Sequence, residues 1–245
     1  MSSDKPASAG NQQGSRAPLD LSDALTPQRP HAELLAVGAE GLEVYLQGAL
    51  KDGTYNASHG THRFGQSDVG WLRLIQQALR LLGHRSWIYR EGSSRNFWVL
   101  ETTAPFLSTE FDRKPLIGVD QGLHYVRGYF DAEGGMPRSA KARLYFQLSQ
   151  KNRESLENVR DILESSGVRC GLLHNPSSRV DPDYWRFYVR SVSHFDFIVK
   201  VGSWHPRKRQ LMIDRMKIWS TPHGDMGSNV NKVAVRERAA GSPPF

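Results

Sequence analysis

The residues of this sequence that could do chemistry are acids placed just before glycines. Glu133 closes an apolar run at 125–132, and Gly134 and Gly135 follow it, as glycine does just past the last turn of a helix. An anion at a helix C-terminus opposes the helix dipole, so this acid indicates a compensating cation nearby. The alternative is an ordinary helix end exposed to solvent. Asp131 lies two residues earlier and points elsewhere, and we expect it to be a solvated acid.

The same pattern occurs once earlier in the chain. Tyr45 and Gly48 lie 80 residues before Tyr125 and Gly128, and Asp52 then stands directly before a glycine. A glycine on one stripe of a helix lets another backbone approach closely. The two segments are therefore candidates for a pair of helices, each ending in an acid.

The elements that follow also repeat. A strand-like run ends at Gln66 or Gln150, 84 residues apart, and an amphipathic helix follows each and ends at Gly83 or Gly167. Two strand-like runs come after each helix, at 84–91 and 95–103 in the first half and at 168–174 and 183–191 in the second. The order helix, strand, helix, strand, strand occurs twice, which predicts two related α/β halves in one chain.

The strands alternate between apolar and polar residues, so helices should cover one face of each sheet and leave a polar face open. The open face is rich in side chains that contact base edges and phosphates. The candidates for DNA contact are Arg63, Arg143, Tyr145, Gln147, Tyr184, Arg186, Tyr188 and Arg190. Any half-exposed sheet is polar outside, but the net charge of +7 and the recurrence in both halves favour nucleic acid.

Composition excludes several other classes of protein. The single cysteine, Cys170, rules out an internal disulfide framework and a thiolate zinc site, and should pack as a small hydrophobe. No apolar run is long enough for a membrane span. The first residues lack the apolar segment of a secretory signal, so we expect an intracellular protein of the cytoplasm or nucleoid, or of an organelle in a eukaryote.

The chain divides into four parts on these patterns. Residues 1–31 and 221–245 are rich in Ser, Gly and Pro without apolar periodicity and are predicted to be a disordered arm and a flexible tail. Residues 32–118 and 119–220 form the two repeats.

The segment 126–134 resembles the nine-residue signature of the LAGLIDADG homing endonucleases in their single-chain, two-repeat form. The strand-to-helix junction at 146–151 and the segment 204–208 also resemble that family's second repeat. The resemblance covers about residues 38–218 and implies two pseudo-symmetric αββαββ(α) repeats of α+β class. Their antiparallel four-stranded sheets would form a saddle over double-stranded DNA, and the protein would act as a monomer.

The resemblance also implies an active site. The two signature helices would meet at Gly48 and Gly128, and Glu133 and Asp52 would reach the scissile phosphates as metal ligands. Two carboxylates brought close repel until a divalent cation neutralises them, and Mg²⁺ is the expected ion.

Three further residues match positions of the family's active site. Gln150 and Gln66 correspond to the polar residue that begins the central helix and organises water. Lys208 lies near the family's basic residue that stabilises charge in the transition state, with Lys200 as the competing choice.

The first repeat departs from the pattern. Asp52 lies four residues after Gly48, whereas Glu133 lies five after Gly128, and strict register would put the acid at Gly53. One residue amounts to about 100° of helix rotation and about 1.5 Å of rise. Either the helix end is reshaped and Asp52 serves, or the first half is degenerate. The expected activity is site-specific cleavage of double-stranded DNA. The alternative is a cleavage-deficient DNA-binding protein or an RNA-splicing maturase acting on intron RNA.

Overall fold

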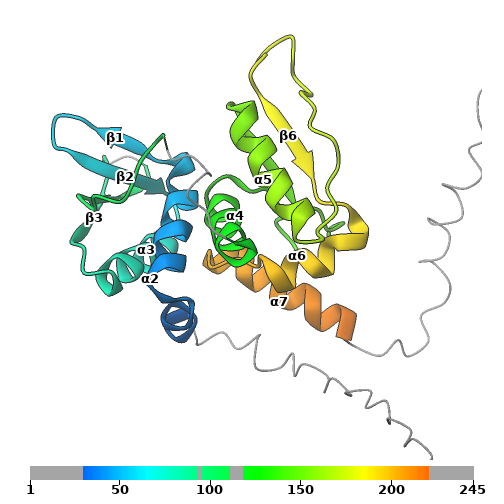
Figure 1. Cartoon of the computed structure of the whole chain (residues 1–245), viewed down its shortest axis with the longest axis horizontal. Helices are drawn as coiled ribbons and strands as arrows, with labels where there is room; N and C mark the ends of the chain where they lie inside the picture. Colours follow the sequence, from blue (N-terminus) through cyan, green and yellow to red (C-terminus); the bar gives the residue numbers. More distant parts are fainter. Residues whose placement is uncertain (1–29, 93–94, 111–117, 221–245) are drawn as a thin grey trace, which may run out of the picture.

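The structure is a computed structural model that describes residues 30–92, 95–110 and 118–220. A pair of packed helices, α2 (Pro30–Ala49) and α4 (Val119–Glu133), lies at its centre, and the two sheets lie on opposite sides of this pair (Figure 1). Helix α2 is interrupted at Gly38, where φ is +75°. The tail at 221–245 and most of the predicted arm lie outside the described residues.

The first half is a four-stranded antiparallel sheet covered on one face by helices. Strand order is β1-β2-β4-β3, with Phe64, Leu100 and Ile88 aligned across β2, β4 and β3 and turned toward the first core. Its elements after α2 are the 3-10 turn η1 (Leu50–Asp52), β1 (Thr54–Asn56), β2 (Thr61–Gln66), α3 (Val69–Leu81), β3 (Ser86–Arg90) and β4 (Trp98–Thr102).

The second half has its own core but a shorter sheet than the resemblance implies. Its elements after α4 are β5 (Gln147–Gln150), α5 (Arg153–Ser165), β6 (Trp185–Tyr188), η2 (Ser191–Ser193), α6 (His194–Lys200) and α7 (Pro206–Ser220). Among the described residues of this half, only β5 and β6 form a continuous ladder, and β5 ends at Gln150 as the predicted strand does.

The strand predicted at 168–174 pairs with β6 only at isolated bridges. Cys170 bridges Val189 and His174 bridges Arg186, which places four steps of one chain against three of the other. This extra residue is a β-bulge, and it interrupts the ladder. The two-repeat α/β class is confirmed, with a first sheet that is more regular than the second.

A side chain caps the start of each amphipathic helix. Asp68 accepts a hydrogen bond from the N–H of Gly70 at the start of α3, and Asn152 accepts one from the N–H of Ser155 at the start of α5. Gly83 and Gly167 follow these helices with φ of +80° and +84°. Helices α3 and α5 therefore begin at fixed positions, shortly after Gln66 and Gln150.

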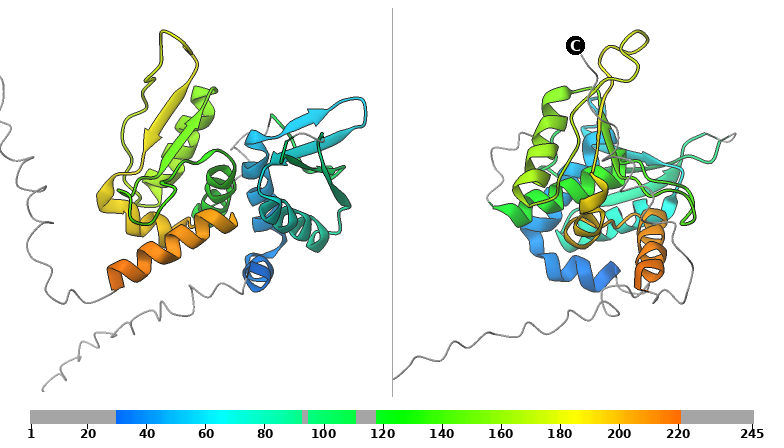
Figure 2. Two further views of the ribbon diagram at one scale, coloured as in Figure 1. Left: turned by 180° about the vertical axis from the view of Figure 1, so that it is seen from behind. Right: turned by 90° about the vertical axis from the view of Figure 1, so that its right-hand side faces the viewer.

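At Gly48 and Gly128 the backbones of α2 and α4 meet without a side chain between them. A Cβ on Gly48 would lie 2.1 Å from the carbonyl oxygen of Tyr125, and a Cβ on Gly128 would lie 2.0 Å from that of Tyr45. The contact is reciprocal, as a pseudo-two-fold axis requires. Figure 2 shows the two helices side by side in further views. The close approach brings the two helix ends, and the acids on them, together.

Helix α7 belongs to the second half but also contacts the first. Arg209 forms a two-pronged ion pair with Glu33 of α2, with both nitrogen–oxygen distances at 2.6 Å. Such a planar pairing fixes orientation as well as distance. It ties α7 to the start of the chain's first described helix.

Candidate active site at the two helix ends

Glu133 is the last residue of α4. The N–H of Gly134 closes the helix on the carbonyl oxygen of Phe130, so the Glu133 side chain projects from the helix end. Burial, and after it the negative charge of Asp52, raises the pKa of Glu133 to about 7. Lys208 and a hydrogen bond with Gln150 act in the opposite direction. The two acids are thus close enough to sense each other's charge.

Asp52 reaches this position because the end of α2 is wound differently. From Gly48 to Asp52 the chain makes one α step and three 3-10 steps, which ideally rise about 7.5 Å and turn about 460°. The five α steps from Gly128 to Glu133 also rise about 7.5 Å and turn about 500°. The 3-10 turn therefore restores the rise and most of the rotation that the missing residue would have supplied.

The position of strict register has no room for a side chain. A Cβ on Gly53 would lie 2.7 Å from the carbonyl oxygen of Arg63 and 2.9 Å from that of Leu50. An acid at 53 would force the backbone of β2 to move. The structure thus accommodates an acid at 52 and not at 53.

The two glutamines hold the two acids in matching ways. Gln66, at the end of β2, donates from Nε2 to Asp52 at 3.3 Å. Gln150, at the end of β5, lies close enough to Glu133 to lower the pKa of that acid. Asp52 is exposed, but desolvation by neighbouring chain still raises its pKa, and the charge of Lys208 opposes this rise. The structure brings all four predicted side chains to one place.

Lys208 lies beneath the acids and is almost fully buried. It projects from the first turn of α7 and donates from Nζ to the carbonyl oxygens of Phe130 and, at 3.0 Å, Asp131. Burial lowers the pKa of Lys208 to about 8, while Asp131, Glu133 and Asp52 act to raise it. The competing candidate, Lys200, is exposed and donates to the carbonyl oxygen of Ser166 at 2.8 Å, apart from this group.

The expectation that Asp131 is solvated is wrong. Its side chain is 1% exposed and accepts hydrogen bonds from the hydroxyl groups of Tyr45 and Ser203 and from the backbone N–H groups of Trp204 and His205. Burial raises the pKa of Asp131, and these hydrogen bonds and Lys208 oppose the rise.

Sequence reasoning missed this role of Asp131, although a signal was present. Asp131 lies three residues after Gly128 and therefore on the face that meets the partner helix. Through Tyr45 of α2 and the segment before α7 it links the two halves directly behind the acids.

The predicted DNA-contacting residues of the second half form one polar face. Gln147 lies opposite Tyr188 and Ser149 opposite Arg186, while Leu148 and Phe187 turn to the core. Arg186 donates from Nε to His174 at 3.2 Å, and Gln147 donates to Tyr184 at 3.3 Å. Arg143, Tyr145 and Arg190 are exposed nearby in the chain. In the first half Arg63 is engaged by acids, so its charge is already balanced.

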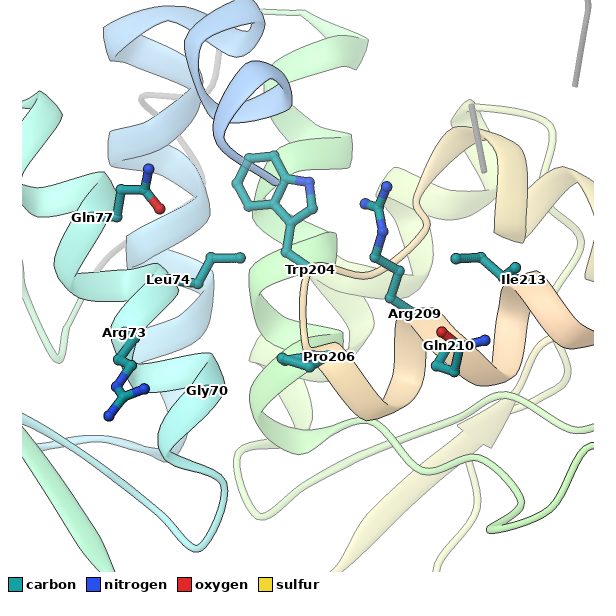
Figure 3. A pocket seen from close by; sticks show the side chains of 9 residues that line it. All are labelled: Gly70, Arg73, Leu74, Gln77, Trp204, Pro206, Arg209, Gln210 and Ile213. Carbon is teal, nitrogen blue, oxygen red and sulfur yellow. The ribbon is translucent and has the colours of Figure 1, made fainter. Parts of the chain in front are cut away.

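A separate cavity lies between α3 and the start of α7. Its volume is about 330 Å³, and its walls are Gly70, Arg73, Leu74, Gln77, Trp204, Pro206, Arg209, Gln210 and Ile213 (Figure 3). None of the acids or glutamines of the candidate site lines it. Trp204 and Pro206 precede Lys208 in the same segment, so the cavity borders the turn that positions this lysine.

The donor set suits a hard divalent cation. Two carboxylates supply oxygen ligands, and their mutual repulsion, together with the raised pKa of Glu133, is a charge conflict that a cation would relieve. Among the described residues no group of three or more His, Cys, Asp and Glu could enclose a metal alone. Mg²⁺ commonly completes its shell with water and substrate phosphates instead.

Comparisons with known proteins find similarity to LAGLIDADG-like proteins. Residues 120–200 match the family model described as a LAGLIDADG-like domain. Homing endonuclease I-ApeI of Aeropyrum pernix is 28% identical over 188 residues, which span 67% of this chain and 82% of that protein. No helix among the described residues has the length and apolar character needed to cross a membrane.

Solved structures share the architecture at low sequence identity. I-DmoI in complex with DNA and Mn has a TM-score of 0.52 and 17% identity, covering 67% of this chain and 98% of that one. Full-length DUF199/WhiA from Thermatoga maritima has a TM-score of 0.56 and 17% identity, covering 82% and 68%. These likenesses show the fold.

Proposed function

We propose that the chain is a two-repeat member of the LAGLIDADG family and a site-specific endonuclease that cleaves both strands of double-stranded DNA with a divalent metal, Mg²⁺ being the expected ion. The observation that carries the proposal is the meeting of Asp52 and Glu133, one from each half, above Lys208. I-ApeI is named a homing endonuclease, and I-DmoI has been seen with DNA and divalent metals.

Each residue of the site has a role that its surroundings support. Asp52 and Glu133 would hold the cation, and Gln66 and Gln150 would orient the two carboxylates. When bound, a divalent cation would supply activation of water and stabilisation of the leaving oxygen of the phosphodiester. Lys208 keeps a positive charge beneath the acids, where it stabilises negative charge that develops on the phosphate.

The protein would bind DNA as a monomer, through the open faces of its two sheets. Arg186, Arg190 and Arg143 give the second half a positive, polar surface suited to phosphate and base contacts. The chain's net charge of +7 adds a long-range attraction for a polyanion.

The second candidate function is a protein on the same fold that binds DNA, or intron RNA as a maturase, without cutting. Two observations favour it: the family model matches only residues 120–200, and the acid of the first half is displaced by one residue. Binding would then rest on the sheets alone.

A randomised duplex DNA library incubated with Mg²⁺ separates the two functions. The wild-type protein is expected to retain and cut a defined set of sequences. Glu133→Gln should retain the same set but cleave at least about a hundredfold more slowly, because metal stabilisation of the transition state is worth several kcal/mol. Retention without cleavage by the wild type would contradict the nuclease, and failure to retain any nucleic acid would contradict both candidates.

A further inference from the structure

The outer face of the first sheet carries acidic side chains. The strands of the second sheet, β5 and β6, carry no acid. Because Phe64 and Leu100 turn to the core, their neighbours Arg63 and Glu101, which lie opposite each other, turn outward. Tyr89 of β3 lies on the same outer face. An acid on a face that meets DNA repels phosphate, so its presence needs another explanation.

Arg63 is held on this face by a network of specific contacts. Its Nε lies 3.0 Å from Glu101, whose side chain is only 8% exposed and also accepts from the hydroxyl group of Tyr89 at 2.7 Å. Its Nη2 donates to Glu91 at 2.7 Å and to Tyr89 at 3.1 Å. Three contacts to three partners fix the plane of the guanidinium group.

Glu91 is also fixed from its other side. Its second oxygen lies 3.0 Å from Arg95, and the Arg95 guanidinium carbon lies 5.0 Å from the centre of the Phe97 ring. Phe97 in turn lies over Gly65, where a Cβ would approach it to 2.6 Å. Arg95 and Phe97 thus pack against the sheet and hold Glu91 beside Arg63.

This cluster is unsuited to holding phosphate by charge. Two arginines, Arg63 and Arg95, face two carboxylates, Glu91 and Glu101, so the formal charges cancel. Arg63 and Glu91 are both partly exposed, so the cluster offers solvent a hydrogen-bond donor next to an acceptor. The Nη1 group of Arg63 has no hydrogen bond or ion pair to any described residue, and each oxygen of Glu91 keeps a further lone pair.

We propose that Arg63 and Glu91 together recognise one G·C base pair in the major groove, a specificity role that rests on the proposed DNA-binding function. In that groove guanine offers two acceptors, N7 and O6, and cytosine beside it offers the N4 amino donor. Arg63 would donate to guanine, and Glu91 would accept from cytosine. An A·T pair puts a donor between two acceptors and does not match this order.

Glu101 acts here as a positioning residue. Being buried and hydrogen-bonded by Tyr89 and Thr61, it holds Arg63 in place before DNA arrives, which lowers the entropy lost on binding.

Selection from a randomised duplex library in Ca²⁺, followed by sequencing of the bound DNA, tests the proposal. The wild type should fix a G·C pair at one position. Glu91→Gln and Arg63→Lys should each relax that position by about tenfold, since one good base contact of this kind is worth roughly 1–3 kcal/mol. Arg63→Lys keeps the charge beside Glu101 but loses the planar fork.

The matched control is Glu157→Gln, which removes an exposed i,i+4 partner of Arg153 on α5. It should leave every position unchanged, and thermal unfolding verifies that all variants are folded. If the wild type selects a sequence that neither Glu91→Gln nor Arg63→Lys alters, or if the altered position is an A·T pair, the base-pair assignment is overturned while DNA recognition stands. If the wild type selects no sequence, the proposed function fails and this assignment fails with it.

Discussion

At the scale of single residues, the candidate site is a balance of charge in a partly desolvated place. Glu133 and Asp52 repel each other, and the buried Lys208 below them attracts both. Lys208 cannot neutralise two acids and also satisfy Asp131, so a deficit of positive charge remains where metal and phosphate chemistry is proposed. The site is therefore costly to keep without a cation.

This cost predicts a pH-dependent stability. The pKa of Glu133 is about 7 in the folded protein and near its ordinary 4.5 when unfolded. Between these values the folded state holds a proton that the unfolded state has released, so the free energy of unfolding decreases as pH rises through this window. Glu133→Gln should flatten this decrease. Urea unfolding of the metal-free protein at pH 5 and pH 7.5 measures it.

Glu157→Gln, at an exposed position of α5, is the control and should keep the wild-type pH dependence. An identical pH dependence in the wild type and Glu133→Gln would show that Glu133 is not held at a raised pKa.

At the scale of elements, the contact between α2 and α4 decides whether the acids meet. A methyl group at Gly128 would lie 2.0 Å from a backbone oxygen of α2, and no side-chain rotation relieves that clash. Gly128→Ala should therefore lower the free energy of unfolding by about 3 kcal/mol, near the upper end of ordinary overpacking costs.

Gly135→Ala is its control, because a Cβ there meets only ordinary contacts from 3.5 Å outward. Denaturant unfolding of both variants measures the difference. Equal stability of Gly128→Ala and the wild type would mean that the helices do not pack through this glycine.

The sequence predicted elements well where local chemistry determines them. Gly83 and Gly167 follow the ends of their helices as expected, because a left-handed glycine acts within one turn. Strand pairing depends on partners distant in the chain, so the bulge between Cys170 and His174 gave no local signal.

Part of the candidate site was likewise predictable from local sequence, and part depends on distant contacts. Glu133 and Gln150 follow from the motif and its junction, whereas the reshaped end of α2 that carries Asp52 depends on how η1 packs against α4. The burial of Asp131 depends on Ser203 and Trp204, which lie more than seventy positions away. A sequence pattern alone does not report such contacts.

At the scale of the whole molecule, the two halves share a fold but differ in surface and register. The second half matches the LAGLIDADG-like family model and has an outer strand face without acids, while the first half has Asp52 one residue out of register and a charge-balanced cluster around Arg63. The Glu33–Arg209 ion pair and the buried Asp131 join the halves into one unit. One chain therefore carries two unlike sheets, as the proposed recognition of an asymmetric DNA site requires.

The most direct test of this account is single-turnover cleavage, in Mg²⁺ or Mn²⁺, of a duplex selected by the wild-type protein. Asp52→Asn should bind this duplex about as tightly as the wild type but cut it at least about a hundredfold more slowly, because the cation would lose one of its two carboxylates. Asp183→Asn, in an exposed loop, should cut normally. Cleavage by Asp52→Asn at the wild-type rate would contradict the claim that the two halves build one active site.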